Sequence, residues 1–161
     1  MKPKIRVGFG YDVHALAEGH EFWLGGIKID HTKGAVGHSD ADVLIHVICD
    51  ALLGASNLRD IGFHFPDTDE KYKGIDSKKL LKVVDRLIKE KGFGIVNIDA
   101  TVSLQKPKIG PYIESMKVCL ADILGLPVED VSIKATTTEK LGFVGKEEGV
   151  AAQAVVLLYF D

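Results

Sequence analysis

Hydrophobic and polar residues alternate over several segments of this chain, which is the pattern of half-buried β-strands. The first such segment contains Ile5, Val7 and Phe9, and a later one is interrupted by Gly25-Gly26, which indicates a turn or bulge. The segment nearest the C-terminus is apolar almost throughout, so we expect that strand to lie in the centre of a sheet. The predicted strands span residues 4–14, 21–30, 95–104, 131–135 and 150–160.

Other segments carry apolar residues three or four positions apart, which is the spacing of helices. The first of them is expected to begin with a capping box formed by Ser39 and Asp42. Residues 31–37 and 57–76 follow neither period, so we expect loops there, and a loop as long as the second is commonly functional. The predicted helices span residues 39–54, 77–91 and 111–124.

This order of strands and helices predicts an α/β fold, a sheet with helices packed on one face. The chain has 161 residues, of which 46% are hydrophobic, and we expect a single compact domain over residues 1–161. The strands at 95–104 and 150–160 look buried on more sides than three helices can cover. We therefore expect a homo-oligomer to supply the missing cover.

The formal net charge of −3 argues against a nucleic-acid partner, because nucleic-acid binding needs a basic face. We also expect no membrane partner, since no apolar run reaches the roughly 20 residues that span a bilayer. No secretory signal begins the sequence. The expected location is the cytoplasm, or a plastid-type organelle if a transit peptide has been removed. Cys49 and Cys119 are expected to be free thiols.

Three polar residues from two segments are candidates to hold one metal ion. Asp12 and His14 lie two positions apart on a predicted strand, so their side chains point to the same side. His46 lies on the first predicted helix, away from its apolar stripe. Two imidazoles and a carboxylate suit zinc better than calcium or magnesium, and three protein ligands leave one position open. The alternative is three unrelated polar residues, but the combined motif favours a metal.

Two further segments offer contacts to anions. His38 and Ser39 stand at the start of the first predicted helix, where the helix dipole and main-chain N–H groups favour a phosphate. The segment Thr136-Thr137-Thr138-Glu139-Lys140 follows a strand and could cradle a phosphate, with Glu139 as a magnesium ligand. The plainer alternatives are a capping histidine and a solvated strand end.

Three other features are weaker when each is taken alone. Residues 105–110 follow a strand and offer two lysines and an unusual main-chain path. Residues 60–62 and 65–69 are rich in carboxylates that could bind hydroxyl groups, and Lys146 adds a cation. Each of these segments also fits an ordinary polar turn.

Taken together and in this order, the motifs resemble those of the 2-C-methyl-D-erythritol 2,4-cyclodiphosphate synthases, enzymes of the non-mevalonate isoprenoid pathway. The resemblance covers nearly the whole chain through GYDVHAL, HSDADVLIH, DALLGA, DIG, FPDTD, KGIDS, QKPK and KATTTEKLGFVGKEEG. It implies a homotrimer with active sites between neighbouring subunits. The implied reaction is attack by the 2-phosphate of 4-diphosphocytidyl-2-C-methyl-D-erythritol 2-phosphate on its own β-phosphate, with release of CMP.

The resemblance also implies a role for each matching residue. Zinc is held by Asp12, His14 and His46. A magnesium or manganese ion bridges the substrate diphosphate with help from Glu139, while His38 and Thr137 stabilise the transition state. The implied substrate contacts are Asp12, Val13, His14, His38, Ser39, Asp60, Ile61, Gly62, Phe65, Pro66, Asp67, Thr68, Asp69, Leu104, Gln105, Lys106, Pro107, Lys108, Ile109, Gly110, Thr136, Thr137, Thr138, Glu139, Phe143 and Lys146.

Two residues depart from the pattern of the family. Lys146 stands where many members carry arginine, and a lysine lacks the planar fork that holds a phosphate firmly. Ala41 stands where glycine is common, which is harmless on the helix predicted there. Members of the family enclose an apolar channel on the trimer axis that can hold an isoprenoid diphosphate, and the resemblance implies this partner. Two other functions fit the same residues: a zinc-dependent phosphohydrolase, and a non-enzymatic trimer that binds an isoprenoid or a nucleotide.

Overall fold

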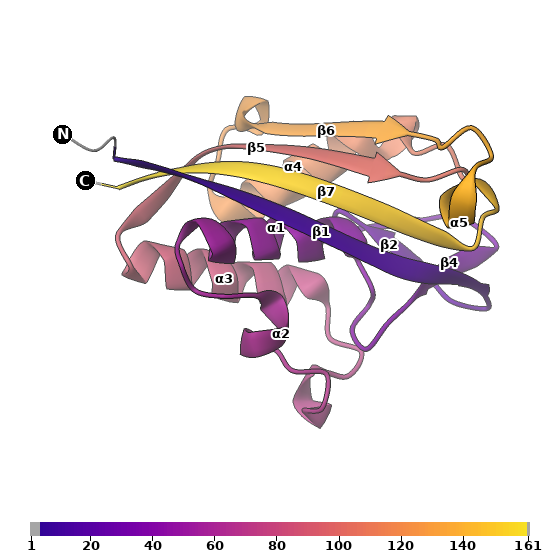
Figure 1. The fold of residues 1–161 in the computed structure, drawn as a ribbon, viewed down its shortest axis with the longest axis horizontal. Helices are drawn as coiled ribbons and strands as arrows, with labels where there is room; N and C mark the ends of the chain where they lie inside the picture. Colours follow the sequence, from indigo (N-terminus) through magenta and orange to yellow (C-terminus); the bar gives the residue numbers. More distant parts are fainter. Residues whose placement is uncertain (1–3, 161) are drawn as a thin grey trace.

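The computed structural model describes residues 4–160. Its centre is a five-stranded sheet with the helices along one face (Figure 1), which confirms the predicted α/β class. The elements, with η for a short 3-10 helix, are β1 (Ile5–Glu18), β2 (Phe22–Leu24), β3 (Ile27–Ile29), β4 (Lys33–Val36), α1 (Val43–Ala55), α2 (Ile61–His64), η1 (Glu70–Tyr72), α3 (Ser77–Glu90), β5 (Phe93–Ser103), η2 (Gly110–Tyr112), α4 (Ile113–Leu124), η3 (Val128–Asp130), β6 (Val131–Thr136), α5 (Gly142–Gly145) and β7 (Gly149–Phe160).

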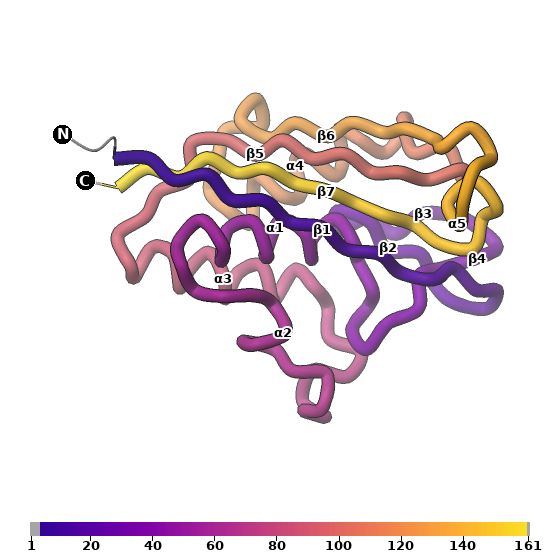
Figure 2. Tube along the Cα trace, in the orientation of Figure 1, coloured from indigo at the N-terminus to yellow at the C-terminus, as the bar shows by residue number. Residues whose placement is uncertain are grey.

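The strand order across the sheet is β4-β1-β7-β5-β6. β7 pairs antiparallel with β1 on one side and with β5 on the other, which confirms that the last strand is central. β5 and β6 run parallel, and α4 lies in the crossover that a parallel pair requires. Ile5 pairs with Tyr159, so the two ends of the described chain run side by side, as the trace in Figure 2 shows.

Two glycines allow α1 to touch the backbone of β1. A Cβ atom on Gly8 would lie 1.9 Å from the Ala51 carbonyl oxygen, and one on Gly10 would lie 2.1 Å from the Val47 carbonyl oxygen. Only a residue without a side chain allows this approach. The close contact brings the middle of β1, next to Asp12, against α1.

The other face of β1 is apolar and exposed. Ile5, Val7, Phe9 and Tyr11 are 50%, 70%, 63% and 53% exposed, whereas the buried side chains form one core between the sheet and the helices. Contiguous apolar surface of this kind usually marks an interface. No helix among the described residues is long and apolar enough to cross a membrane.

The entrance to α1 differs from the prediction. The helix begins at Val43 with Asp42 as its cap, and the Asp42 carboxylate accepts hydrogen bonds from Ile45, Gly25 and Gly26 backbone N–H groups. The predicted capping box of Ser39 and Asp42 is therefore wrong, because a carboxylate with three donors fixes the helix start later. Ala41 is not helical either, since its φ is +56°.

Several short strands and helices were not predicted from the sequence patterns. β4 lies within the segment 31–37, which was predicted to be a loop, and it pairs with the extension of β1 to Glu18. The long segment 57–76 contains the short helices α2 and η1 and hangs away from the sheet (Figure 2). Gly25 and Gly26 both have positive φ and form the tight turn between β2 and β3.

Candidate metal centre and substrate cavities

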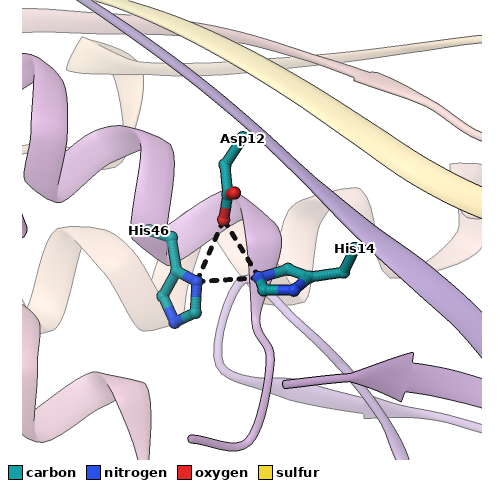
Figure 3. Close-up of side chains that lie close together, drawn as sticks. All are labelled: Asp12, His14 and His46. Atoms are coloured by element: carbon teal, nitrogen blue, oxygen red, sulfur yellow. Dashed lines mark hydrogen bonds and ion pairs between the residues drawn. The ribbon is translucent and has the colours of Figure 1, made fainter. Parts of the chain in front are cut away.

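Asp12, His14 and His46 meet at one point, where β1 crosses α1 (Figure 3). His14 Nε2 lies 3.0 Å from His46 Nδ1 and 3.0 Å from Asp12 Oδ2, and His46 Nδ1 lies 3.1 Å from the same carboxylate oxygen. Alternation along β1 turns Asp12 and His14 to the helix side. The three candidate ligand atoms thus form a nearly equilateral triangle.

This triangle fits a zinc ion. Ligand atoms in a tetrahedral site with bonds of about 2.0 Å lie about 3.3 Å apart, close to the observed separations. The second ring nitrogen of His14, Nδ1, lies 3.2 Å from the Val36 carbonyl oxygen. Because a carbonyl oxygen only accepts, Nδ1 carries the proton of the neutral ring, and the lone pair of Nε2 points into the triangle. Partial burial also suits a metal ligand, and the side chains of His14 and His46 are 17% and 11% exposed.

The electrostatics of the triangle also favour a cation. Burial opposes ionisation of Asp12, but the imidazoles of His14 and His46, when protonated, donate hydrogen bonds that outweigh it and hold the pKa of the carboxyl well below its usual range. Burial likewise disfavours a charged His14, yet its hydrogen bond with Asp12 raises the pKa of that imidazole. Without a metal, His14 therefore holds a proton more tightly than an isolated histidine would, and a metal must displace it.

A cavity of about 500 Å³ adjoins the metal ligands. It gathers residues from three predicted groups, the metal ligands, the anion-binding pair and the carboxylate-rich loop. The predicted site residues that line it are His14, His38, Ser39, His46, Ile61, Gly62, Phe65, Pro66, Asp67 and Thr68. We call this the metal cavity.

A second, smaller cavity of about 140 Å³ lies where β5 and β6 end. The predicted residues that line it are Leu104, Pro107, Lys108, Ile109, Gly110, Thr136 and Thr137. We call this the strand-end cavity. It shares no lining residue with the metal cavity, so His38 and Thr137, predicted to act on one transition state, line different cavities of one chain.

The remaining predicted residues line neither cavity. Asp60 instead caps α2 by accepting a hydrogen bond from Phe63, and Asp69 caps η1 and pairs with Lys71. The Lys106 side chain pairs with Glu147 at 3.4 Å. The others in this group are Asp12, Val13, Gln105, Thr138, Glu139, Phe143 and Lys146.

Sequence reasoning missed several residues of the metal cavity. Tyr72, Ile75 and Leu80 line its wall. The aromatic ring of Tyr72 in an otherwise aperiodic loop was a usable signal. Leu80 belongs to the apolar stripe of α3, and nothing in its spacing distinguishes a cavity wall from the core.

The fold and this centre define a class: an α/β protein with three candidate metal ligands beside a substrate-sized cavity. The chain belongs to the YgbB family, whose model matches residues 5–159. It is 64% identical to the 2-C-methyl-D-erythritol 2,4-cyclodiphosphate synthase of Cytophaga hutchinsonii over 155 residues, which cover 96% of this chain and 98% of that protein.

Solved structures agree with this assignment. The structure of the bifunctional IspDF from Campylobacter jejuni matches with a TM-score of 0.95 and 42% identity, covering 99% of this chain and 43% of that longer one. A 2C-methyl-D-erythritol-2,4-cyclodiphosphate synthase in its CDP-bound form matches with a TM-score of 0.88 and 37% identity, covering 95% and 99% of the two chains. These likenesses confirm the resemblance that the sequence motifs indicated.

Proposed function

We propose that this chain converts 4-diphosphocytidyl-2-C-methyl-D-erythritol 2-phosphate to 2-C-methyl-D-erythritol 2,4-cyclodiphosphate and CMP, as a metal-dependent phosphorus–oxygen lyase. The observation that carries the proposal is the triangle of Asp12, His14 and His46 beside the metal cavity. Relatives of the same length are named for this product, and one solved relative holds CDP.

The reaction is an intramolecular phosphoryl transfer. An oxygen of the 2-phosphate forms a bond to the β-phosphorus, and the bond from that phosphorus to the oxygen shared with the α-phosphate breaks, which releases CMP. The attacking group is already an anion, so no side chain has to remove a proton. The chain must instead hold attacking and leaving oxygens in line and balance the negative charge.

The residues of the two cavities would divide this work. His38 and Ser39 would donate hydrogen bonds to phosphate oxygens, because both line the metal cavity next to the ligand triangle. Asp67 and Thr68 would bind hydroxyl groups of the methylerythritol portion. Residues 104–110 and 136–139, with Phe143 and Lys146, would hold the cytidine diphosphate portion, and Thr137 would join His38 at the transition state.

Two kinds of cation complete the proposal. Zinc at Asp12, His14 and His46, and magnesium or manganese at Glu139, would supply Lewis acids that neutralise the diphosphate. Asp12 is suited to its part because the low pKa of its carboxyl keeps it ionised. His14 is suited because its hydrogen bond to Val36 leaves Nε2 with a lone pair.

We further propose a homotrimer with active sites between subunits. The exposed apolar face of β1 needs cover, and the two cavities of one chain share no lining residue. The strand-end cavity of one subunit would complete the metal cavity of its neighbour. The covered faces would surround an axial channel suited to an isoprenoid diphosphate, and the enzyme would work in the cytoplasm or a plastid-type organelle.

Phosphorus NMR of the protein with this substrate, magnesium and trace zinc tests the reaction. We expect the signals of a cyclic diphosphate and of CMP to appear together and at equal rates. Release of inorganic phosphate would instead identify a phosphohydrolase. Unchanged substrate that is nevertheless bound would identify a binding protein.

A further inference from the structure

A chain of hydrogen bonds leads away from the metal centre through the second ring nitrogen of His46. This nitrogen, Nε2, lies 3.0 Å from the Ser77 hydroxyl oxygen and 3.1 Å from the Ser39 hydroxyl oxygen. Ser77 is the first residue of α3 and is fully buried. Its hydroxyl also makes a short hydrogen bond to Oδ1 of Asp40. The path therefore runs from His46 through Ser77 to a carboxylate that is not a metal ligand.

The direction of each bond in this path follows from the chemistry of its members. A carboxylate only accepts, so the single hydroxyl proton of Ser77 goes to Asp40. The Ser77 oxygen then has only lone pairs to offer His46, so Nε2 must carry the ring proton. The other nitrogen of the neutral ring, Nδ1, is left with its lone pair facing Asp12 and His14.

Asp40 is itself held firmly. Its Oδ2 accepts a hydrogen bond of 2.9 Å from the Ser77 backbone N–H, and its Oδ1 accepts one of 3.1 Å from the Asp42 backbone N–H. These bonds join the entrance of α1 to the start of α3. The Ser39 hydroxyl oxygen accepts a hydrogen bond from the Ala41 backbone N–H and is not hydrogen-bonded to Asp40, so Ser39 does not substitute for Ser77 in this path.

We propose that Asp40, acting through the Ser77 hydroxyl, is a positioning residue that selects the His46 tautomer able to bind the metal. The inference rests on the metal site of the proposed function and adds to it the group that sets one ligand. Metal-bound histidines commonly owe their tautomer and orientation to such an outer carboxylate. Here the Asp40 carboxylate does not touch the histidine and acts through the buried hydroxyl group of Ser77.

Replacement of Asp40 by asparagine separates this role from simple packing. In Asp40→Asn the amide NH₂ group meets a backbone donor in either orientation. It faces the Ser77 N–H, or it faces the Asp42 N–H and the Ser77 hydroxyl together and reverses the hydroxyl bond. In the second case Ser77 donates its proton to His46 Nε2, and the ring proton moves to Nδ1, where it blocks the metal. The matched control is Asp76→Asn, because Asp76 caps the same helix through Lys78 but does not touch Ser77 Oγ or His46.

Two measurements on the full chain test the proposal without substrate. Nitrogen-15 NMR of the metal-free protein at alkaline pH should find His46 protonated at Nε2 in the wild type and in Asp76→Asn, and a larger fraction of the ring protonated at Nδ1 in Asp40→Asn. Competition with a chelator should find zinc bound about 10- to 100-fold more weakly by Asp40→Asn, as for other outer-shell changes, and unchanged by Asp76→Asn.

A second pair of variants covers the case in which Asp40→Asn does not fold. Ser77→Ala removes the relay and should weaken zinc binding, whereas Ser77→Thr keeps the hydroxyl and should restore it. Zinc affinity that falls equally in Ser77→Ala and Ser77→Thr would overturn the proposal, as would a wild-type His46 protonated at Nδ1. If zinc binding behaves as expected but no cyclic diphosphate forms, the proposed reaction fails and this inference stands.

Discussion

The metal cavity and the segment 137–146, which follows β6, differ in how many contacts their side chains already make. At the metal centre each ligand nitrogen and oxygen already has partners within 3.2 Å, and the second nitrogens of both imidazoles are fixed by a carbonyl or a hydroxyl. In the segment 137–146, the side chains of Glu139 and Lys146 make no hydrogen bond or ion pair with any residue of the described part of the chain.

The backbone near Glu139 is fixed by a local turn. Glu139 and Lys140 have φ of +52° and +66°, which a tight turn with two left-handed central residues requires, and the Leu141 backbone N–H donates to the Thr138 carbonyl oxygen across it. Gly145 packs closely on this turn, because a Cβ atom there would lie 2.1 Å from the Lys140 carbonyl carbon. The comparison teaches that the two regions differ in their side chains: those of the ligand triangle already contact one another, whereas those of Glu139 and Lys146 are left for the partners that the proposed function assigns to them.

Loss of a metal ligand should have the largest effect. His46→Ala removes one corner of the triangle and leaves two ligands, so we expect zinc content to vanish and turnover to fall by at least about 10³-fold. The strand-end cavity does not involve His46, so CMP, which lacks the β-phosphate, should bind with unchanged affinity. Zinc analysis, the rate of CMP release and calorimetry with CMP measure these three quantities, and the exposed His20→Ala is the control. A variant that keeps a near-normal rate would remove the metal assignment.

Glu139→Gln should change the magnesium requirement and leave zinc content intact, in contrast to His46→Ala. The glutamine cannot balance a divalent cation, so we expect kcat to fall by about 10²-fold and the magnesium requirement to rise, with zinc content unchanged. Magnesium titrations at saturating substrate measure the effect, with the exposed helix residue of Glu90→Gln as the control. If Glu139→Gln also lost zinc, the two halves of the site would not be independent.

Mixing the two inactive variants tests whether the halves come from different subunits. In a trimer reassembled from equal amounts of His46→Ala and Glu139→Gln, about a quarter of the sites would combine two intact halves at random. We expect turnover to recover to about that fraction of the wild-type rate. Each variant refolded alone is the control, and the absence of any recovery would place both halves of a site in one chain.

The pH dependence of zinc binding should report His14. Its pKa is raised by Asp12, so protons compete for Nε2 already above the ordinary histidine pKa of about 6.5. Above that raised pKa, zinc affinity should be constant. Below it, zinc affinity should fall about tenfold per pH unit for each proton that zinc displaces. Chelator competition across pH measures it.

The metal-free chain should respond to pH with the opposite sign. A group with a raised pKa in the fold stabilises the fold below its unfolded pKa, and this contribution is lost as pH rises through the folded pKa. Metal-free protein should therefore lose stability with rising pH in the same window. Denaturation of the zinc-free protein at several pH values checks this, and parallel trends with and without zinc would contradict it.

The fold and the ligand triangle could be predicted from the sequence, whereas most of the surroundings of the site could not. Strand alternation places Asp12 and His14 on one side, and helical spacing sets His46 apart from its apolar stripe, so local periodicity is enough to nominate them. The bonds of Asp40 to Ser77 join two helix starts 37 positions apart. No local pattern encodes such a pairing, because it depends on how α1 and α3 pack.

The same limit explains why the conformation of Ala41 was predicted wrongly. A substitution at Ala41 gives the smallest effect that we expect. The sequence pattern predicts that Ala41 lies on a helix, where alanine in place of glycine is harmless, but its φ of +56° is a conformation that glycine adopts freely. Ala41→Gly should gain about 1–2 kcal/mol from relief of that conformation. It should lose about 0.8 kcal/mol with the buried methyl group and about 0.4–1 kcal/mol through the greater entropy of the unfolded chain. The terms nearly cancel, so we expect the free energy of unfolding to change by less than about 1 kcal/mol. Urea denaturation of the zinc-loaded protein measures the change. A typical substitution costs about 1 kcal/mol. A loss of about 2 kcal/mol or more would therefore show that the Ala41 methyl group holds the Asp40 segment in place.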